Sequence, residues 1–317
     1  MARLHWLAHH AAIASSPGVQ RLSDTASELP RILAVAQAQH PDPAGWSLAM
    51  NVDWLEHSYF GTGVSRNLQG LPSGELGGCA SVLIDPENSG AITVTAMLRP
   101  GSEQLWAAQL TWIEAQVEGA GATQVRVVSE CLTEAEAHRW VAAGYDLVFE
   151  ELAMERDITR ETPPPARWPR GSTLVEWGNS AAEASFEVYE AAFRERPGFP
   201  GWLRSEWIDA LTGDDDFLPA ASLCVLLDGM PAGFVVCLTG WIDQVGVAPA
   251  HRRLGLASAL VTEATARMRA LGIGVARLHV NGNNPGALAA WRRLGWRESG
   301  RRGRFERVLS SRAPAET

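Results

Sequence analysis

The sequence predicts an α+β protein in which helices flank mixed, mostly antiparallel sheets, arranged as two similar modules. The chain has 317 residues, a length that suits two domains. Short apolar strands alternate along it with amphipathic helices. A proline run at residues 162–166 cannot continue a helix and favours an extended spacer. We therefore expect modules at residues 1–161 and 171–317, with a linker over residues 162–170.

The composition narrows the function classes. The net charge of −9 argues against a nucleic-acid binder, which needs a basic surface, and the chain contains no lysine. No apolar run approaches the roughly 20 residues of a membrane helix, and the N-terminus lacks a signal-peptide pattern. The four cysteines are scattered without a CxxC pair, so no metal site is expected. We expect a cytoplasmic protein, monomeric or homodimeric.

Each half predicts a series of strands and helices. In the first half the helices are expected at residues 26–39, 48–58, 103–118 and 134–143, and the strands at 78–84, 91–97 and 124–128. In the second half the helices are expected at 180–194, 203–211, 256–271 and 285–294, and the strands at 174–177, 221–227, 233–238, 242–247, 275–280 and 305–309. Both halves thus contain the order strand, loop, helix, strand, helix.

The two halves align without a gap. When Gly144 is placed on Gly295, an offset of 151, four further identities follow: Trp140 with Trp291, Gly121 with Gly272, Arg126 with Arg277 and Ala108 with Ala259. A constant offset through two strands and two helices indicates an internal duplication.

One loop of the second half has the pattern of an anion site. After the strand at 242–247, the motif Arg-x-x-Gly-x-Ala is formed by Arg252, Gly255 and Ala257, and a long helix follows. Small residues let a ligand approach the backbone, and the free amides of a first helical turn favour a pyrophosphate. The alternative interpretation is a solvated, arginine-rich helix start.

A second motif follows the next strand. Asn284 precedes Pro285, a residue pair suited to begin a helix, and Ala287, Trp291, Gly295 and Trp296 follow at fixed spacings. The two motifs together resemble the GNAT superfamily of N-acetyltransferases. With two modules in one chain, the layout is similar to that of mycothiol synthase-like proteins.

The resemblance implies a mixed sheet whose two central parallel strands splay apart to admit acetyl-CoA, or another acyl-CoA, as co-substrate. It also implies direct attack on the thioester by a primary amine of a small molecule. The residues that would bind the cofactor under this resemblance are Val245, Gly246, Val247, Arg252, Arg253, Leu254, Gly255, Leu256, Ala257, Ser258, Asn284, Ala287 and Trp291.

The chain departs from the family where many members have a proton-donating tyrosine. Trp291 occupies this position, and an indole has no useful acid pKa, so the thiolate would take its proton from water or leave as the anion. For the general base we favour Asp243, two residues before Val245 on the same strand face. His279 and Glu187 are the candidates behind it. The alternative, non-catalytic interpretation is that Asp243 is a solvated strand-end aspartate and His279 a packed histidine.

The first module has lost these features. At the same offset, Gly255 becomes Gln104, Ala257 becomes Trp106, Asp243 becomes Ile92 and Asn284 becomes Thr133. A bulky indole and a β-carbon should exclude a diphosphate, so we expect a degenerate module with a structural role. The alternative is residual CoA binding, with residues 99–102 forming a shorter anion-binding nest in another register.

Two other functions stay open: a non-catalytic acyl-CoA-binding sensor or scaffold, and an aminoacyl or peptidyl transferase, against which the intact loop argues. Of the thirteen tryptophans, Trp112, Trp140, Trp207 and Trp291 are expected in cores, while Trp202 and Trp241 are candidate pocket walls.

Overall fold

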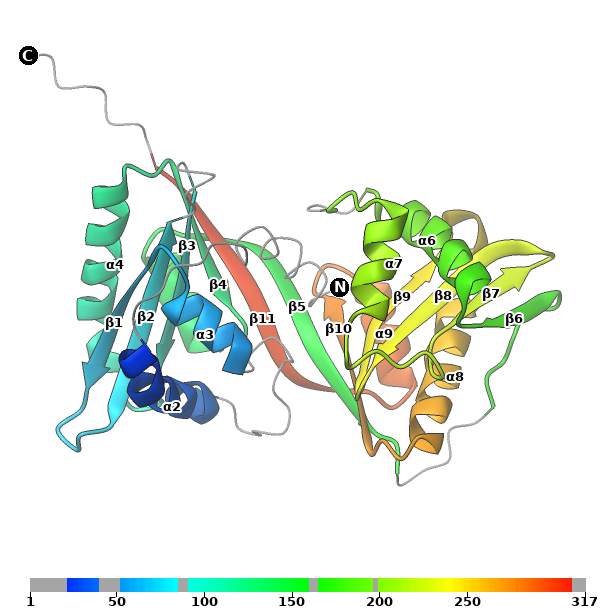
Figure 1. The fold of residues 1–317 in the computed structure, drawn as a ribbon, viewed down its shortest axis with the longest axis horizontal. Helices are drawn as coiled ribbons and strands as arrows, with labels where there is room; N and C mark the ends of the chain where they lie inside the picture. The colour runs from blue at the N-terminus through cyan, green and yellow to red at the C-terminus, as the bar shows by residue number, and fades with distance from the viewer. Residues whose placement is uncertain (1–21, 40–51, 85–90, 160–164, 196–198, 310–317) are drawn as a thin grey trace, which may run out of the picture. The chain divides into compact units, whose positions relative to one another are not determined.

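The computed structural model describes residues 22–39, 52–84, 91–159, 165–195 and 199–309, which form two compact units (Figure 1). Within these residues, the C-terminal unit holds Ala153–Val280 and Asn284–Ser299. The N-terminal unit holds the chain up to Leu152, Asn281–Asn283 and the chain from Gly300. Each unit therefore includes a segment from the other half of the sequence, which the predicted division does not contain. Most of the proline run lies outside the described residues.

The N-terminal unit is built on a mixed sheet. Its elements are α2 (Leu22–Gln39), α3 (Val52–Phe60), β1 (Val64–Gly70), β2 (Leu76–Ile84), β3 (Ala91–Leu98), the 3₁₀ turn η3 (Glu103–Leu105), α4 (Trp106–Ala120), β4 (Gln124–Ser129), α5 (Glu134–Ala142) and the first part of β5 (Asp146–Asp157). Strands β1, β2 and β3 are antiparallel, and β3 and β4 are parallel. The end of β11 (Arg297–Val308) runs antiparallel to β4.

The core of this unit lies between the sheet and helices α4 and α5. Ile113 of α4 and Trp140 of α5 are fully buried against Val125 and Val127 of β4 and Phe305 of β11. These apolar side chains alternate with partly exposed ones along β4, which is the pattern of a strand buried on one face.

The C-terminal unit repeats this plan. Its elements are β6 (Ser172–Glu176), α6 (Asn179–Phe193), α7 (Arg204–Thr212), β7 (Leu223–Leu227), β8 (Met230–Leu238), β9 (Trp241–Val247), the 3₁₀ turn η4 (Pro249–His251), α8 (Leu256–Ala270), β10 (Val275–Asn281) and α9 (Pro285–Arg293). Strands β6 to β9 are antiparallel, and β9 and β10 are parallel. The strand order through the chain is β1-β2-β3-β4-β11-β5-β10-β9-β8-β7-β6.

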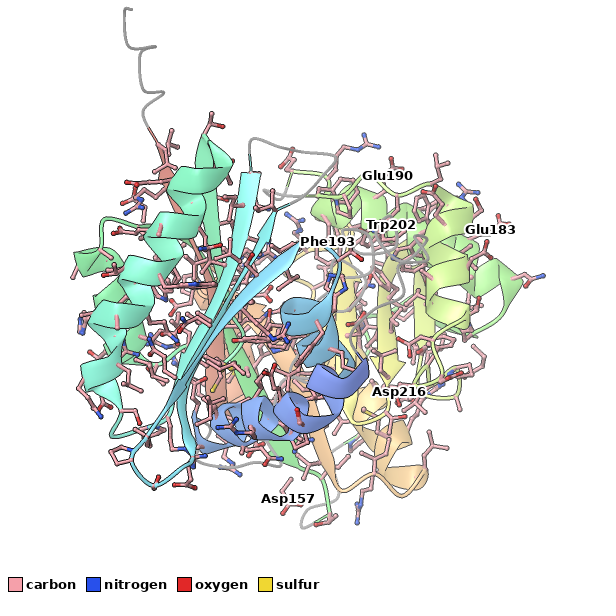
Figure 2. All side chains as sticks on the ribbon, turned by 60° about the vertical axis from the view of Figure 1, so that its left-hand side comes forward. Asp157, Glu183, Glu190, Phe193, Trp202 and Asp216 are labelled. Atoms are coloured by element: carbon pink, nitrogen blue, oxygen red, sulfur yellow. The ribbon has the colours of Figure 1, made fainter. Side chains whose placement is uncertain are left out.

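An aromatic cluster joins α6 and α7 to β8. Phe186, Tyr189 and Trp207 of the helices pack with Phe234 of the strand, and all four are buried. Partly buried aromatic side chains pack against this cluster, among them Phe193 and Trp202 (Figure 2). The helices are therefore held to the sheet by large apolar side chains near the end of α6.

The structure confirms the α+β class and most of the predicted elements. One prediction was wrong in form: the helix expected from residue 103 begins as a 3₁₀ turn, and the α-helix begins at Trp106. Trp140, Trp207 and Trp291 are buried as expected, and Trp112 is partly buried. None of the helices in the described ranges is both long and apolar enough to cross a bilayer.

Three strands were missed or shortened in the prediction. Strands β1 and β5 were not predicted, and β11 begins at Arg297, well before the expected start at residue 305. The sequences of β1 and β11 are polar and lack alternating apolar residues. In β11, ion pairs take the place of that pattern: Arg301 with Glu150, Arg302 with Glu151 and Arg126 with Glu306.

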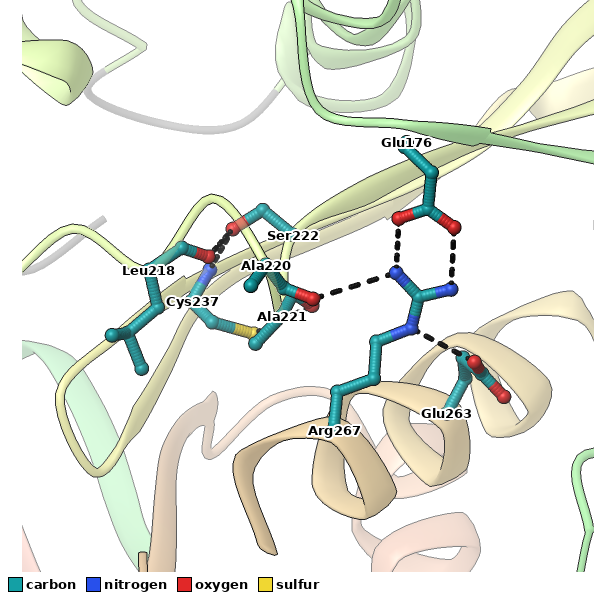
Figure 3. Close-up of polar contacts among 8 residues, drawn as sticks. All are labelled: Glu176, Leu218, Ala220, Ala221, Ser222, Cys237, Glu263 and Arg267. Carbon is teal, nitrogen blue, oxygen red and sulfur yellow. Dashed lines mark hydrogen bonds and ion pairs between the residues drawn. The ribbon is translucent and has the colours of Figure 1, made fainter. Parts of the chain in front are cut away.

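Arg267 of α8 connects this helix to the edge strand β6 (Figure 3). Its guanidinium donates two hydrogen bonds to the Glu176 carboxylate, of which Nη2 to Oε1 measures 2.9 Å. Its Nε donates to Glu263 Oε1 at 2.8 Å. The hydrogen bonds from Arg267 hold the pKa of the Glu176 carboxyl below its ordinary value. A bidentate ion pair thus fixes the sheet edge to α8.

We expect Arg267→Met to lower the free energy of unfolding by about 1 kcal/mol at pH 7, measured by urea denaturation. Because the folded state lowers the pKa of Glu176, this stabilisation is present above the ordinary carboxyl pKa and is lost as pH falls through the folded value. Arg194→Met, which breaks a more exposed pair with Glu190, is the control. Equal stability of the Arg267 variant and the parent at pH 7 would contradict this assignment.

Glu136 of α5 is a buried carboxyl with an exposed fraction of 3%. Nε1 of Trp140 donates to its Oε1 at 3.4 Å. Burial raises the pKa of the Glu136 carboxyl from 4.5 to about 7, against the hydrogen bonds from Ser129 and Trp140 that lower it. The fold therefore favours the protonated form.

This raised pKa has a stability consequence with a defined sign. The contribution of protonated Glu136 is complete below pH 4.5 and is lost as pH rises through about 7. We expect Glu136→Gln to stabilise the protein at pH 8, by at most about 3 kcal/mol, and to leave it unchanged at pH 4. Thermal unfolding at both values measures this, with the exposed Glu134→Gln as control. A pH-independent difference would refute it.

Candidate functional site

The loop between β9 and α8 has an unusual backbone. Arg253 and Gly255 both adopt the left-handed region, with φ of 69° and 87°. No heavy atom lies within 4 Å of a Cβ built on Gly255, so the backbone angle and not crowding favours glycine here. Left-handed residues before a helix turn successive amides toward one side of the loop, which makes an anion-binding concavity.

The start of α8 adds further donors. Gly255 is its N-cap and supplies no side-chain acceptor, so the amides of Leu256, Ala257 and Ser258 lack intrahelical partners. Residues 252–255 are exposed. Arg252 is held in place because its Nη2 donates to the Ala192 carbonyl of α6 at 3.3 Å. The loop therefore presents free amides, a helix dipole and arginine charge to the same region.

Strands β9 and β10 are paired over a short distance only. In the described residues their register contains two pairs, Trp241 with Arg277 and Ile242 with Leu278. Both strands continue beyond these pairs, β9 to Val247 and β10 to Asn281. The two strands therefore part after Ile242 and Leu278, which confirms the predicted splay.

A β-bulge lies where the strands part. Val236 of β8 pairs with Gln244, and its neighbour Cys237 pairs with Ile242, so Asp243 is the extra residue on β9. A bulge bends its strand and re-aims side chains. Because of this bulge, the end of β9 stays paired with β8 although it is no longer paired with β10.

The end of β9 has one face buried and one face open. Asp243, Val245 and Val247 are partly exposed, whereas Gln244 and Gly246 are buried. This confirms that Asp243 and Val245 share a face. A Cβ on Gly246 would lie 2.4 Å from the ring of Phe234, its partner on β8, and 3.3 Å from Phe193 of α6, so glycine leaves room here for the Phe234 ring.

Asp243 and His279 lie at the parting point from opposite strands. Gln244 Nε2 donates to Asp243 Oδ2 at 3.2 Å, and Gln244 Oε1 accepts from Trp207 Nε1 at 3.3 Å. Burial, and then the charge of Asp243, raises the pKa of the Cys237 thiol. Glu187, in contrast, is exposed on α6. Burial, and to a smaller extent the charge of Glu187, raises the pKa of the Cys224 thiol on β7.

The second motif forms the start of α9. Asn284 is the N-cap, with Oδ1 accepting from the Ala287 amide at 3.1 Å, and Pro285 is the first helical residue, as predicted. Trp291 on the same helix is 4% exposed and Trp296 is 3% exposed. Asn284 and Ala287 therefore shape the helix start, and both indoles are packed.

The comparisons with known proteins agree with this geometry. Residues 183–296 match the family model described as Acetyltransferase (GNAT) family. This matched segment, which covers most of the C-terminal unit, is similar to the GNAT family. A mycothiol acetyltransferase of Rhodococcus erythropolis (strain PR4 / NBRC 100887) is 29% identical over 171 residues. That match covers 49% of this chain and 57% of the relative, so it spans little more than half of the relative's length.

Two solved GNAT structures resemble the chain in fold. A GCN5-related N-acetyltransferase from Sphaerobacter thermophilus has a TM-score of 0.67 and 21% identity, and the likeness covers 89% of this chain and 93% of that one. A tandem GNAT protein from the clavulanic acid biosynthesis pathway has a TM-score of 0.56 and 16% identity, covering 89% and 95%. The fold of this chain is that of tandem GNAT structures.

The strands of the N-terminal unit pair differently from their counterparts in the C-terminal unit. β3 and β4 form four parallel pairs, from Ala91 with Gln124 to Val94 with Val127. The antiparallel register of β2 and β3 runs without a shift. The unit thus lacks, among its described residues, the bulge found at Asp243, and β3 pairs with β4 over four residues before it continues to Leu98 beside β2.

The corresponding N-terminal loop is filled by the protein's own side chains. The Gly101 amide donates to Glu103 Oε1 at 3.1 Å, and hydrogen bonds from the amides of Glu103 and Gly101 lower the pKa of the Glu103 carboxyl. The ring of Trp106 packs edge-on against Trp140 at 4.8 Å, and the Arg139 guanidinium lies 5.5 Å from the Trp106 centroid. A carboxylate and an indole therefore occupy the region that the other loop leaves open.

Three features of these loops and strands were not predicted from the sequence: the left-handed Arg253, the bulge at Asp243 and the carboxylate of Glu103. Only Glu103 had a sequence signal, its position two residues after a loop glycine.

Gly255→Gln should abolish acetyl-CoA binding, because its side chain would enter the open side of the loop and its left-handed angle would be strained by about 1–2 kcal/mol. Calorimetric titration measures the binding. Gly272→Gln is a matched control, since Gly272 has φ of 84° and the same open surroundings. If the Gly255 variant binds as tightly as the parent, this loop is not the pyrophosphate site.

Proposed function

We propose that this chain transfers the acetyl group of acetyl-CoA to a primary amine of a small molecule, and that the reaction takes place in the C-terminal unit. The parting of β9 and β10 at Asp243, beside an open left-handed loop, carries this proposal. The match to the acetyltransferase family supports the reaction. The likeness to a mycothiol acetyltransferase supports a small-molecule acceptor.

The residues of the C-terminal unit suit acetyl-CoA, which supplies a thioester carbonyl open to attack by an amine. The loop of Arg252, Arg253, Leu254, Gly255, Leu256, Ala257 and Ser258 would hold the pyrophosphate with its amides and charges. The main chain of Val245, Gly246 and Val247 would pair with the pantetheine arm, since this part of β9 has left β10. Asn284, Ala287 and Trp291 would complete the wall from α9.

Asp243 is the proposed general base. It is partly exposed at the point where the strands part, so a substrate amine can reach its carboxylate directly or through a water. The hydrogen bond from Gln244 orients this carboxylate. His279 is the second candidate for this role. Trp291 cannot serve as a general acid, because an indole N–H does not ionise usefully.

The N-terminal unit is proposed to be structural. Glu103 already occupies amides of the corresponding loop, and Trp106 fills the adjoining space. One acetyl-CoA per chain is therefore expected.

Mixing the pure protein with acetyl-CoA and a panel of amines, and following free thiol, tests the function. Thiol release that depends on an amine supports the transferase. Binding of acetyl-CoA with no thiol release for any amine would favour the alternative, an acyl-CoA-binding sensor or scaffold.

Asp243→Asn should lower turnover by about 10²–10⁴-fold, the usual contribution of a positioned base. Affinity for acetyl-CoA should hardly change, because the side chain lies at the parting point and away from the pyrophosphate loop. Part of the lost rate should return at high pH, where the amine is already neutral. A pH–rate profile measures both effects.

The control for this variant is Asp209→Asn, which changes an exposed carboxylate on α7. Full activity of the Asp243 variant across the pH range would remove this residue from the mechanism and leave His279 as the next candidate.

A further inference from the structure

The two strands of the site are bridged by stacked rings at the point where they part. The centroids of Trp241 on β9 and His279 on β10 are 4.8 Å apart, and the ring planes differ by 30°. Trp241 is 5% exposed, so its ring is packed on nearly all sides. Trp241 was predicted as a candidate pocket wall and His279 as a candidate base, but their contact was not predicted.

The opposite face of the sheet is closed at the same level. Ile242 and Leu278 form the last parallel pair, with exposed fractions of 3% and 2%. Successive side chains of a strand point to opposite faces. Ile242 therefore faces away from Trp241, and Leu278 faces away from His279. Both faces of the sheet are filled by large side chains where the gap ends.

The direction of the gap relates this closed end to the acyl group. The pyrophosphate loop follows Val247, so the proposed pantetheine arm runs along β9 from Val247 toward Asp243. The thioester then lies near Asp243, and an acyl chain longer than acetyl continues toward Trp241.

We infer that the stacked pair of Trp241 and His279 determines acyl-chain specificity and restricts the donor to short acyl-CoA thioesters. This inference rests on the proposed function, because it assumes that acyl-CoA binds in this gap. A longer chain would have to displace a packed indole or a buried aliphatic pair. A single methylene in a tight apolar pocket changes discrimination by about 10–200-fold.

The test compares the dissociation constants of acetyl-CoA and hexanoyl-CoA by calorimetry, so that no acceptor is needed. We expect the parent to bind acetyl-CoA at least about tenfold more tightly than hexanoyl-CoA. Trp241→Leu should reduce this preference by about tenfold or more, because it opens the closed end. Trp241→Phe keeps an aromatic ring over His279 and should retain the preference.

Trp140→Leu provides a control for general destabilisation, because it removes a fully buried indole from the N-terminal core. It should lower thermal stability without altering the ratio of the two dissociation constants. If Trp241→Leu does not fold, the parent and Trp241→Phe still decide: equal binding of both thioesters by the parent overturns the inference. An unchanged ratio in folded Trp241→Leu also overturns it. Failure of the parent to bind acetyl-CoA at all would instead refute the proposed function.

Discussion

The candidate site depends on one constraint, the β-bulge at which Asp243 is the extra residue of β9. A strand held in register on both sides keeps all its main-chain groups in the sheet. The bulge lets β9 stay paired with β8, where Val245 lies opposite Val235, while it leaves β10. The main chain that would recognise a pantetheine arm becomes available only through this departure. The same residue brings a carboxylate to the point of separation.

The N-terminal unit shows what the duplicated pattern becomes without this constraint. Its β2 and β3 pair without a shift, and β3 and β4 stay together for four pairs. The loop that follows does not need a bound anion, because the Glu103 carboxylate already accepts a hydrogen bond from the Gly101 amide. Trp106 fills the position of Ala257. Strand pairing, loop and helix start have thus changed together, which supports a structural role for the unit.

The sequence predicted those parts of the site that depend on local residue chemistry. Gly255 before a helix, and Asn284 before Pro285, specify loop and cap geometry within a few residues, and both were confirmed. The bulge and the stack of Trp241 on His279 depend on the register of two strands distant in sequence. Strand β11 was underpredicted for the same reason: its arginines are satisfied by glutamates elsewhere in the chain. The sequence of a strand alone does not reveal partners that lie far away along the chain.

The exchange of strand ends makes the C-terminal unit depend on residues that precede the proline run. Ala153–Asp157 belong to this unit, and Glu155 among them is 4% exposed. Its carboxylate lies 3.7 Å from Arg277 Nε on β10 and also pairs with Arg297. The Ile158 amide donates to the Gly274 carbonyl at 2.9 Å, immediately before β10 begins. Because β10 carries His279, one wall of the site is held in place by this earlier segment. A chain that began after the linker would lack this support, so the C-terminal unit depends on residues from the first half of the sequence.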